Sequence, residues 1–113
     1  MNNLFLVRQW YYLSCNEFAG FQTSTSKNQI FGSSFPLAYF VRKCIDMFDV
    51  PYTLQQITSN VDKINKLYGG LAPNVTNVYT TQGQLDPFIE GGLQTDLNPS
   101  APAYVIPSKN LYF

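Results

Sequence analysis

The sequence predicts an α/β fold in which two helices and about three short strands form one flank of a larger sheet. Two segments carry apolar residues at helical spacing, and each is bounded by residues that start or stop helices. Three other segments are short apolar runs that suit strands. Three strands are too few for a complete doubly wound sheet, so the chain is expected to supply part of one.

The first expected strand is the apolar and aromatic run at residues 4–13. Its length and aromatic content favour a buried strand, although periodicity alone does not separate that from a buried helix. The following segment, 15–34, is rich in Ser, Thr, Asn, Gln and Gly and predicts a long loop. A structureless loop of about 20 residues is uncommon unless it binds something or packs on a neighbouring domain.

Two amphipathic helices are predicted after this loop. The first begins at Pro36, whose fixed φ suits a first helical turn, and ends near residues 49–51. The second begins after Thr53, where Gln56 completes a capping box, and ends at the glycine pair 69–70. Both carry apolar side chains at intervals of three and four residues, which indicates one buried face each.

A single acidic side chain marks the candidate site. Residues 75–80 and 103–106 predict two further strands, and Asp86 follows the first of them within the run GQLDPF at 83–88. The carboxyl ends of strands in an open α/β sheet are where ligands bind. Taken alone, the run favours an ordinary turn aspartate, because Asp-Pro is common in turns.

Composition excludes several function classes. The 113 residues carry seven basic and seven acidic side chains, so nucleic-acid binding has no electrostatic basis and no basic cluster predicts a membrane surface. No apolar window reaches the length of a membrane span, and the stretch at 4–7 is too short for a signal peptide. Two cysteines and no histidine predict no metal site, and no cofactor is expected.

Two further features bear on the compartment. From the residues alone, Cys15 and Cys44 are equally compatible with two buried thiols and with one disulfide. A bridge would close a 29-residue step and stabilise the fold by about 3.6 kcal/mol on the chain-entropy model. Asn74 begins the glycosylation sequon Asn-Val-Thr, whereas the proline at 99 disqualifies the triplet 98–100.

Blocks spread over residues 8–107 resemble, in the same order, the prolyl carboxypeptidase and dipeptidyl peptidase II family, which also includes thymus-specific serine protease. The blocks are RQWYY (8–12), CNEF (15–18), FQT (21–23), FPL (35–37), CIDMF (44–48), NKLYGG (65–70), TNV (76–78), GQLDPF (83–88) and VIP (105–107). The resemblance covers nearly the whole chain.

This resemblance implies an α/β-hydrolase fold and a lysosomal or secreted serine exopeptidase that cleaves after proline or other small residues. The triad of such enzymes runs Ser, Asp, His along the chain, and Asp86 matches its acid, which would orient the His and stabilise the imidazolium. Cys15 and Cys44 match a pair that is bridged in relatives, which implies an oxidising compartment. The expected partner is a peptide with proline near the scissile bond, and a family-like homodimer is expected of the full-length protein.

The catalytic parts other than Asp86 are expected outside this chain. In the family the nucleophilic Ser belongs upstream of residue 8, and the His follows a few residues after 107. We therefore expect residues 1–107 to be a C-terminal fragment of a peptidase domain, 108–113 to be an atypical tail, and the start of the domain to lie upstream. The 113-residue chain by itself is predicted to be inactive.

Three side chains are candidates for substrate binding. Phe88 replaces the Trp of the family's Asp-Pro-Trp, and its smaller ring, which lacks the indole N–H donor, can still stack on a proline. Glu17 is a candidate for receiving a substrate's free amine, against the alternative of a solvated loop residue. Trp10 is a candidate for lining a cleft, against the alternative of a core aromatic. A second function class stays open: a non-catalytic, divergent relative that binds a peptide or a protein through its aromatic side chains.

Overall fold

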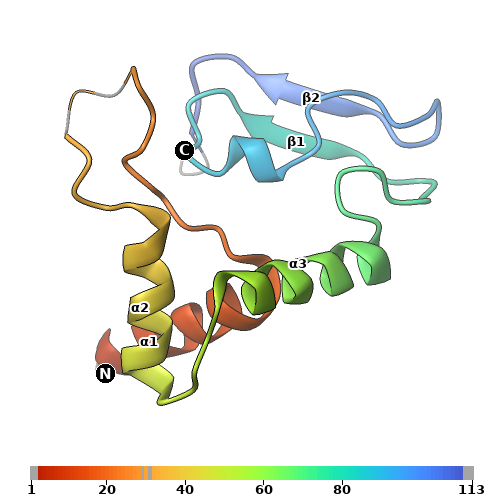
Figure 1. Ribbon diagram of the computed structural model, residues 1–113. Coiled ribbons are helices and arrows are strands. Elements are labelled where there is room, and N and C mark those ends of the chain that lie inside the picture. The colour runs from red at the N-terminus through yellow and green to blue at the C-terminus, as the bar shows by residue number, and fades with distance from the viewer. Residues whose placement is uncertain (1–2, 29, 31, 111–113) are drawn as a thin grey trace. The chain divides into compact units, whose positions relative to one another are not determined.

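The computed structural model describes residues 3–28, 30 and 32–110 and divides the chain into two units, one ending at Leu67 and one beginning at Tyr68 (Figure 1). The elements run in the order α1 (Asn3–Leu13), η1 (Ser14–Phe18), α2 (Leu37–Phe48), α3 (Leu54–Tyr68), β1 (Thr80–Gly83), η2 (Ile89–Gly91) and β2 (Ala103–Ile106). Helices make up the first unit, and a small parallel sheet makes up the second. This mixture is compatible with the predicted α/β class.

The prediction of a buried strand at residues 4–13 is wrong. The segment is the helix α1, and it continues into a single π-helical turn, η1, where a loop was expected. The run has only one β-branched residue, Val7, and its Leu, Arg and Gln residues are good helix formers. Its side chains are also largely exposed within the described chain, with Leu6 at 60% and Trp10 at 47%.

Both predicted amphipathic helices are confirmed, as α2 and α3. Pro36 stands one position before the first turn of α2, as its N-cap, and Asp49 ends that helix in the left-handed region at φ 53°. At the start of α3 the N–H of Gln56 donates a 3.1 Å hydrogen bond to Oγ1 of Thr53, as the capping pattern predicts. Gly69 stops α3 with a φ of 90°, a conformation that few other residues adopt.

The core of the first unit is a small cluster around a disulfide. Cys15 of η1 and Cys44 of α2 are bridged, with their Cα atoms 5.9 Å apart and both side chains fully buried. Tyr52 and Ile57 complete the buried cluster. Residues 19–36 have no helix or strand in their described part. This loop contacts α2 through Phe21, whose ring stacks on that of Phe40 with the centroids 5.2 Å apart.

The second unit is built on a two-stranded parallel sheet. β1 and β2 lie side by side (Figure 1). Their register sets Thr80 opposite Ala103 and Gly83 opposite Ile106. The strand predicted at 103–106 is confirmed, whereas the one predicted at 75–80 begins only at Thr80. Asn77 interrupts the predicted segment, because its φ of 57° lies outside the strand region.

Candidate active site

Asp86 lies three residues beyond the last residue of β1, at the carboxyl end of the parallel strands, as the sequence predicts. Its N–H donates to the carbonyl oxygen of Gly83 at 3.0 Å, and its own carbonyl oxygen accepts from Ile89 at 3.1 Å. The residue is only 4% exposed. A tight turn therefore leads the chain from the strand end into η2 and buries the aspartate on the way.

One oxygen of the Asp86 carboxylate is fixed by the backbone. Oδ1 accepts a 2.8 Å hydrogen bond from the N–H of Phe88, which closes a local turn across Pro87. A carboxylate has about four acceptor positions, so this bond orients the group and leaves it able to accept another donor. The arrangement suits a carboxylate that holds a neighbouring side chain in place.

The segment after β2 closes against the same turn. The N–H of Leu85 donates to the carbonyl oxygen of Lys109 at 2.7 Å, and the N–H of Ser108 donates to Oε1 of Gln84 at 3.0 Å. A methyl group added at Gly83 would stand 2.6 Å from the Lys109 oxygen, so only glycine lets this segment approach so closely. The segments that follow the two parallel strands thus lie together at one edge of the sheet.

The candidate binding residues fall into two groups. Phe88 is 48% exposed and adjoins Asp86 through the hydrogen bond just described. Trp10 and Glu17 belong to the first unit. The rings of Trp10 and Phe18 pack in a T-shaped arrangement with centroids 5.3 Å apart, and Glu17 is half-buried in η1. The structure therefore brings Phe88 together with Asp86, and it assigns Trp10 and Glu17 to the other unit.

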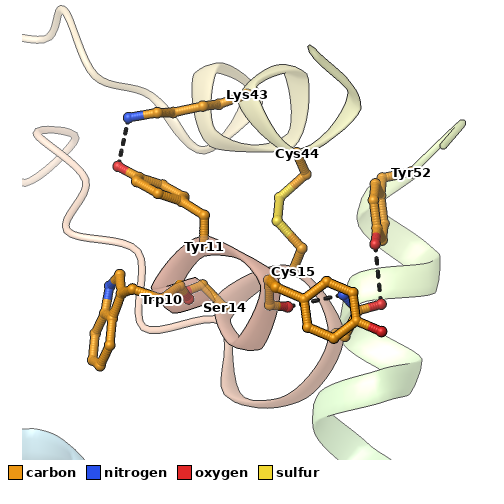
Figure 2. The surroundings of a disulfide bond; sticks show 9 residues. Trp10, Tyr11, Ser14, Cys15, Lys43, Cys44 and Tyr52 are labelled. Atoms are coloured by element: carbon orange, nitrogen blue, oxygen red, sulfur yellow. Dashed lines mark hydrogen bonds between the residues drawn. A yellow bond between two sulfur atoms is a disulfide. The ribbon is translucent and has the colours of Figure 1, made fainter. Parts of the chain in front are cut away.

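The disulfide and its surroundings are shown in Figure 2. The bridge implied by the resemblance is present. Beside it, Nζ of Lys43 donates to the hydroxyl of Tyr11 at 2.6 Å and stands 3.9 Å from the centre of that ring. No local sequence pattern predicts this pair, because the two residues are 32 positions apart.

The remaining features considered in the sequence are the glycosylation sequon, the C-terminal tail, membrane-spanning segments and metal ligands. Asn74 is exposed, in a segment without regular secondary structure. Of the predicted tail 108–113, residues 108–110 are described and the last three lie outside the described residues. Within the described ranges no helix has the length and apolar character to cross a bilayer, and no group of three or more potential ligands is placed to hold a metal ion.

Comparison with known proteins identifies relatives. The chain matches the family described as serine carboxypeptidase S28 over residues 1–111. It is 39% identical over 83 residues to “Putative serine protease F56F10.1” of Caenorhabditis elegans, which covers 73% of this chain and 15% of that protein. It is 30% identical over 106 residues to thymus-specific serine protease of Mus musculus, which covers 94% of this chain and 20% of that protein. No solved structure matches the chain significantly.

The chain thus spans a fifth or less of the length of these two curated relatives. The family match nevertheless extends across both units and includes the Asp86 turn, the bridged cysteines and the strand β2. It confirms the resemblance carried by the sequence blocks. The chain belongs to the serine carboxypeptidase S28 family of serine peptidases.

Proposed function

We propose that Asp86 is the acid of a Ser–Asp–His triad in a serine exopeptidase, to which this chain contributes that carboxylate and one wall of the substrate pocket. The observation that carries the proposal is the position of Asp86: a buried carboxylate, oriented by a backbone N–H, three residues beyond the end of a parallel strand. Family membership supplies the chemistry that such a carboxylate would serve.

In this role Asp86 accepts a hydrogen bond from the Nδ1–H of a histidine, selects the productive tautomer and stabilises the imidazolium, without itself taking the proton. The 113 residues contain no histidine, so the imidazole comes from outside them. In this proposal the nucleophilic serine also comes from outside the 113 residues. The parallel strand pair is then part of an α/β-hydrolase sheet that other segments complete.

The substrate we propose is a peptide with proline near the scissile bond, in a secreted or lysosomal enzyme. Phe88 supports the substrate class, because a half-exposed phenyl beside the triad acid offers a flat apolar surface for a pyrrolidine ring. The Cys15–Cys44 bridge supports the compartment, because structural disulfides persist in oxidising surroundings.

The first test uses the 113-residue chain itself. It should neither turn over a chromogenic prolyl dipeptide nor react with a fluorophosphonate that labels active serines. Turnover by purified chain that disappears in Asp86→Asn would refute the division of the triad proposed here. The gene on either side should encode a Gly-x-Ser-x-Gly turn upstream and a histidine downstream, and their absence would favour a non-catalytic, peptide-binding relative.

The second test uses the longer gene product. Asp86→Asn should lower kcat by roughly 10⁴-fold, since the amide no longer favours the productive tautomer of the histidine. Asp96→Asn is the matched control, because Oδ1 of Asp96 accepts a 2.7 Å hydrogen bond from Ala103 at the opposite end of the strand pair. Equal losses in the two variants would indicate a structural effect and overturn the assignment of Asp86.

A further inference from the structure

The sequon at residues 74–76 is presented outward by the second unit. Asn74 and Thr76 are exposed, Val75 between them is half-buried, and the three lie outside any helix or strand. The exposed residues of the triplet are therefore the two that the sequon requires. An oligosaccharyl transferase must reach both the asparagine amide and the threonine hydroxyl, and both residues are open to solvent.

Backbone hydrogen bonds hold the middle of the sequon. The N–H of Val75 donates to the carbonyl oxygen of Pro73 at 3.1 Å, so Asn74 forms the apex of a three-residue turn. The carbonyl oxygen of Val75 accepts a 3.0 Å bond from Nδ2 of Asn98. Among the described residues, neither the Asn74 nor the Thr76 side chain is engaged in these bonds, so both stay available.

A second observation concerns the compartment. The Cys15–Cys44 bridge is fully buried at the centre of the first unit's core, so it is part of the folded structure. Such bridges form in the oxidising lumen through which secreted and lysosomal proteins pass. Asparagine-linked glycosylation takes place in the same lumen on Asn-x-Ser/Thr triplets. The bridge and the exposed sequon are separate features that indicate one route of synthesis.

We propose that Asn74 carries an N-linked oligosaccharide. The donor is a lipid-linked diphospho-oligosaccharide whose first sugar is N-acetylglucosamine. Nδ2 of Asn74 forms a bond to C1 of that sugar and loses one proton to a base of the transferase. The bond from C1 to the diphosphate oxygen breaks, and the lipid diphosphate leaves with the electron pair. Thr76 supplies the hydroxyl that the transferase recognises.

The glycan has a physical role in this position. Leu71, Val78 and Tyr79 lie within five residues of Asn74 and are 58%, 42% and 63% exposed. In the 113-residue chain, three large apolar side chains that are close together in the sequence and open to solvent favour self-association. A hydrated oligosaccharide attached among them would oppose such contacts and increase solubility.

The experiment is translation of the full 113-residue chain, behind a secretion leader, in the presence of microsomes. We expect a band of higher mass that peptide N-glycosidase returns to the unmodified position, leaving aspartate at residue 74 in the peptide mass spectrum. Asn74→Gln and Thr76→Ala should each abolish the shift, and Thr76→Ser should retain it. Asn98 is an internal control, because the proline that follows it should keep it unmodified.

Two results would overturn the proposal. The first is an unmodified wild-type chain in microsomes where non-reducing peptide mapping shows the Cys15–Cys44 bridge. The second is a shift that persists in Thr76→Ala. Neither readout depends on peptidase activity, so the glycan proposal and the triad proposal fail or survive separately.

Discussion

The carboxylate of Asp86 is held by the main chain of Phe88, across a 2.8 Å hydrogen bond from N–H to Oδ1. The aromatic side chain of Phe88 takes no part in that bond. The backbone N–H of Phe88 thus orients the carboxylate of Asp86, while its ring is half-exposed and takes no part in that orientation.

If the proposed function holds, the separate roles of the Phe88 backbone and ring predict the effect of Phe88→Ala in the proposed full-length peptidase. Loss of the ring should raise KM for prolyl substrates by about 3–10-fold, which corresponds to the binding free energy of one aromatic contact. The kcat should stay within a few-fold of wild type. Phe88→Trp should keep KM near the original value or lower it. Steady-state kinetics with a prolyl and an alanyl substrate would measure both, and a fall in kcat with unchanged KM would contradict the assignment.

The disulfide should stabilise the first unit alone. The double variant Cys15→Ala/Cys44→Ala should lose about 3.6 kcal/mol on the chain-entropy model, because the 29-residue step is no longer closed in the unfolded chain. Hydrogen exchange read residue by residue should show the loss in α2 and α3 and unchanged protection in β1 and β2. Equal loss of protection in the strands would show that the units do not unfold separately.

The cap of α3 offers a test of local stability. Thr53→Ala should cost about 1 kcal/mol, because the N–H of Gln56 loses its acceptor, and Thr53→Ser should restore most of it. Thr58 is the matched control: its hydroxyl bonds to the Leu54 carbonyl within the helix, so Thr58→Ala should be neutral or slightly stabilising. Urea denaturation followed by circular dichroism gives the three values, and similar costs at both threonines would argue against the cap.

The close approach at Gly83 predicts a position-specific effect of added volume. Gly83→Ala should destabilise the second unit by about 1–3 kcal/mol, because the new methyl group meets the Lys109 oxygen. Gly91→Ala is the control, since nothing lies within 4 Å of the methyl group there. Hydrogen exchange of the β1–β2 ladder would separate the two, and a neutral Gly83→Ala would mean that the segment after β2 does not cross the strand end.

Local signals explain what the sequence predicted well. The ends of α3 are set by side-chain capping at Thr53 and by a left-handed glycine at position 69, and both can be recognised within a few residues. The location of Asp86 beyond a strand end likewise follows from a strand pattern and a turn. These features depend little on the rest of the chain.

The features that the sequence did not predict have three separate causes: an ambiguous apolar run, a single backbone angle and contacts between distant residues. Residues 4–13 are apolar without a clear period, so their pattern does not distinguish a strand from a helix. The segment is a helix, in agreement with the helix propensity of its Leu, Arg and Gln residues. The positive φ of Asn77 interrupts the strand that the sequence predicts at residues 75–80. The bonds that fasten Leu85 to Lys109 and Gln84 to Ser108 join residues 24 positions apart and leave no local pattern.

The return of residues 109–110 over Gly83 has a consequence for how this site can change. The strands β1 and β2 are already paired before this point, so the residues after Pro107 contribute little to the ladder itself. Exchanging the short stretch 108–110 would therefore alter which functional groups border the turn that carries Asp86, while the parallel pairing stays intact. The functional groups beside Asp86 can therefore change without a change in the pairing of β1 with β2.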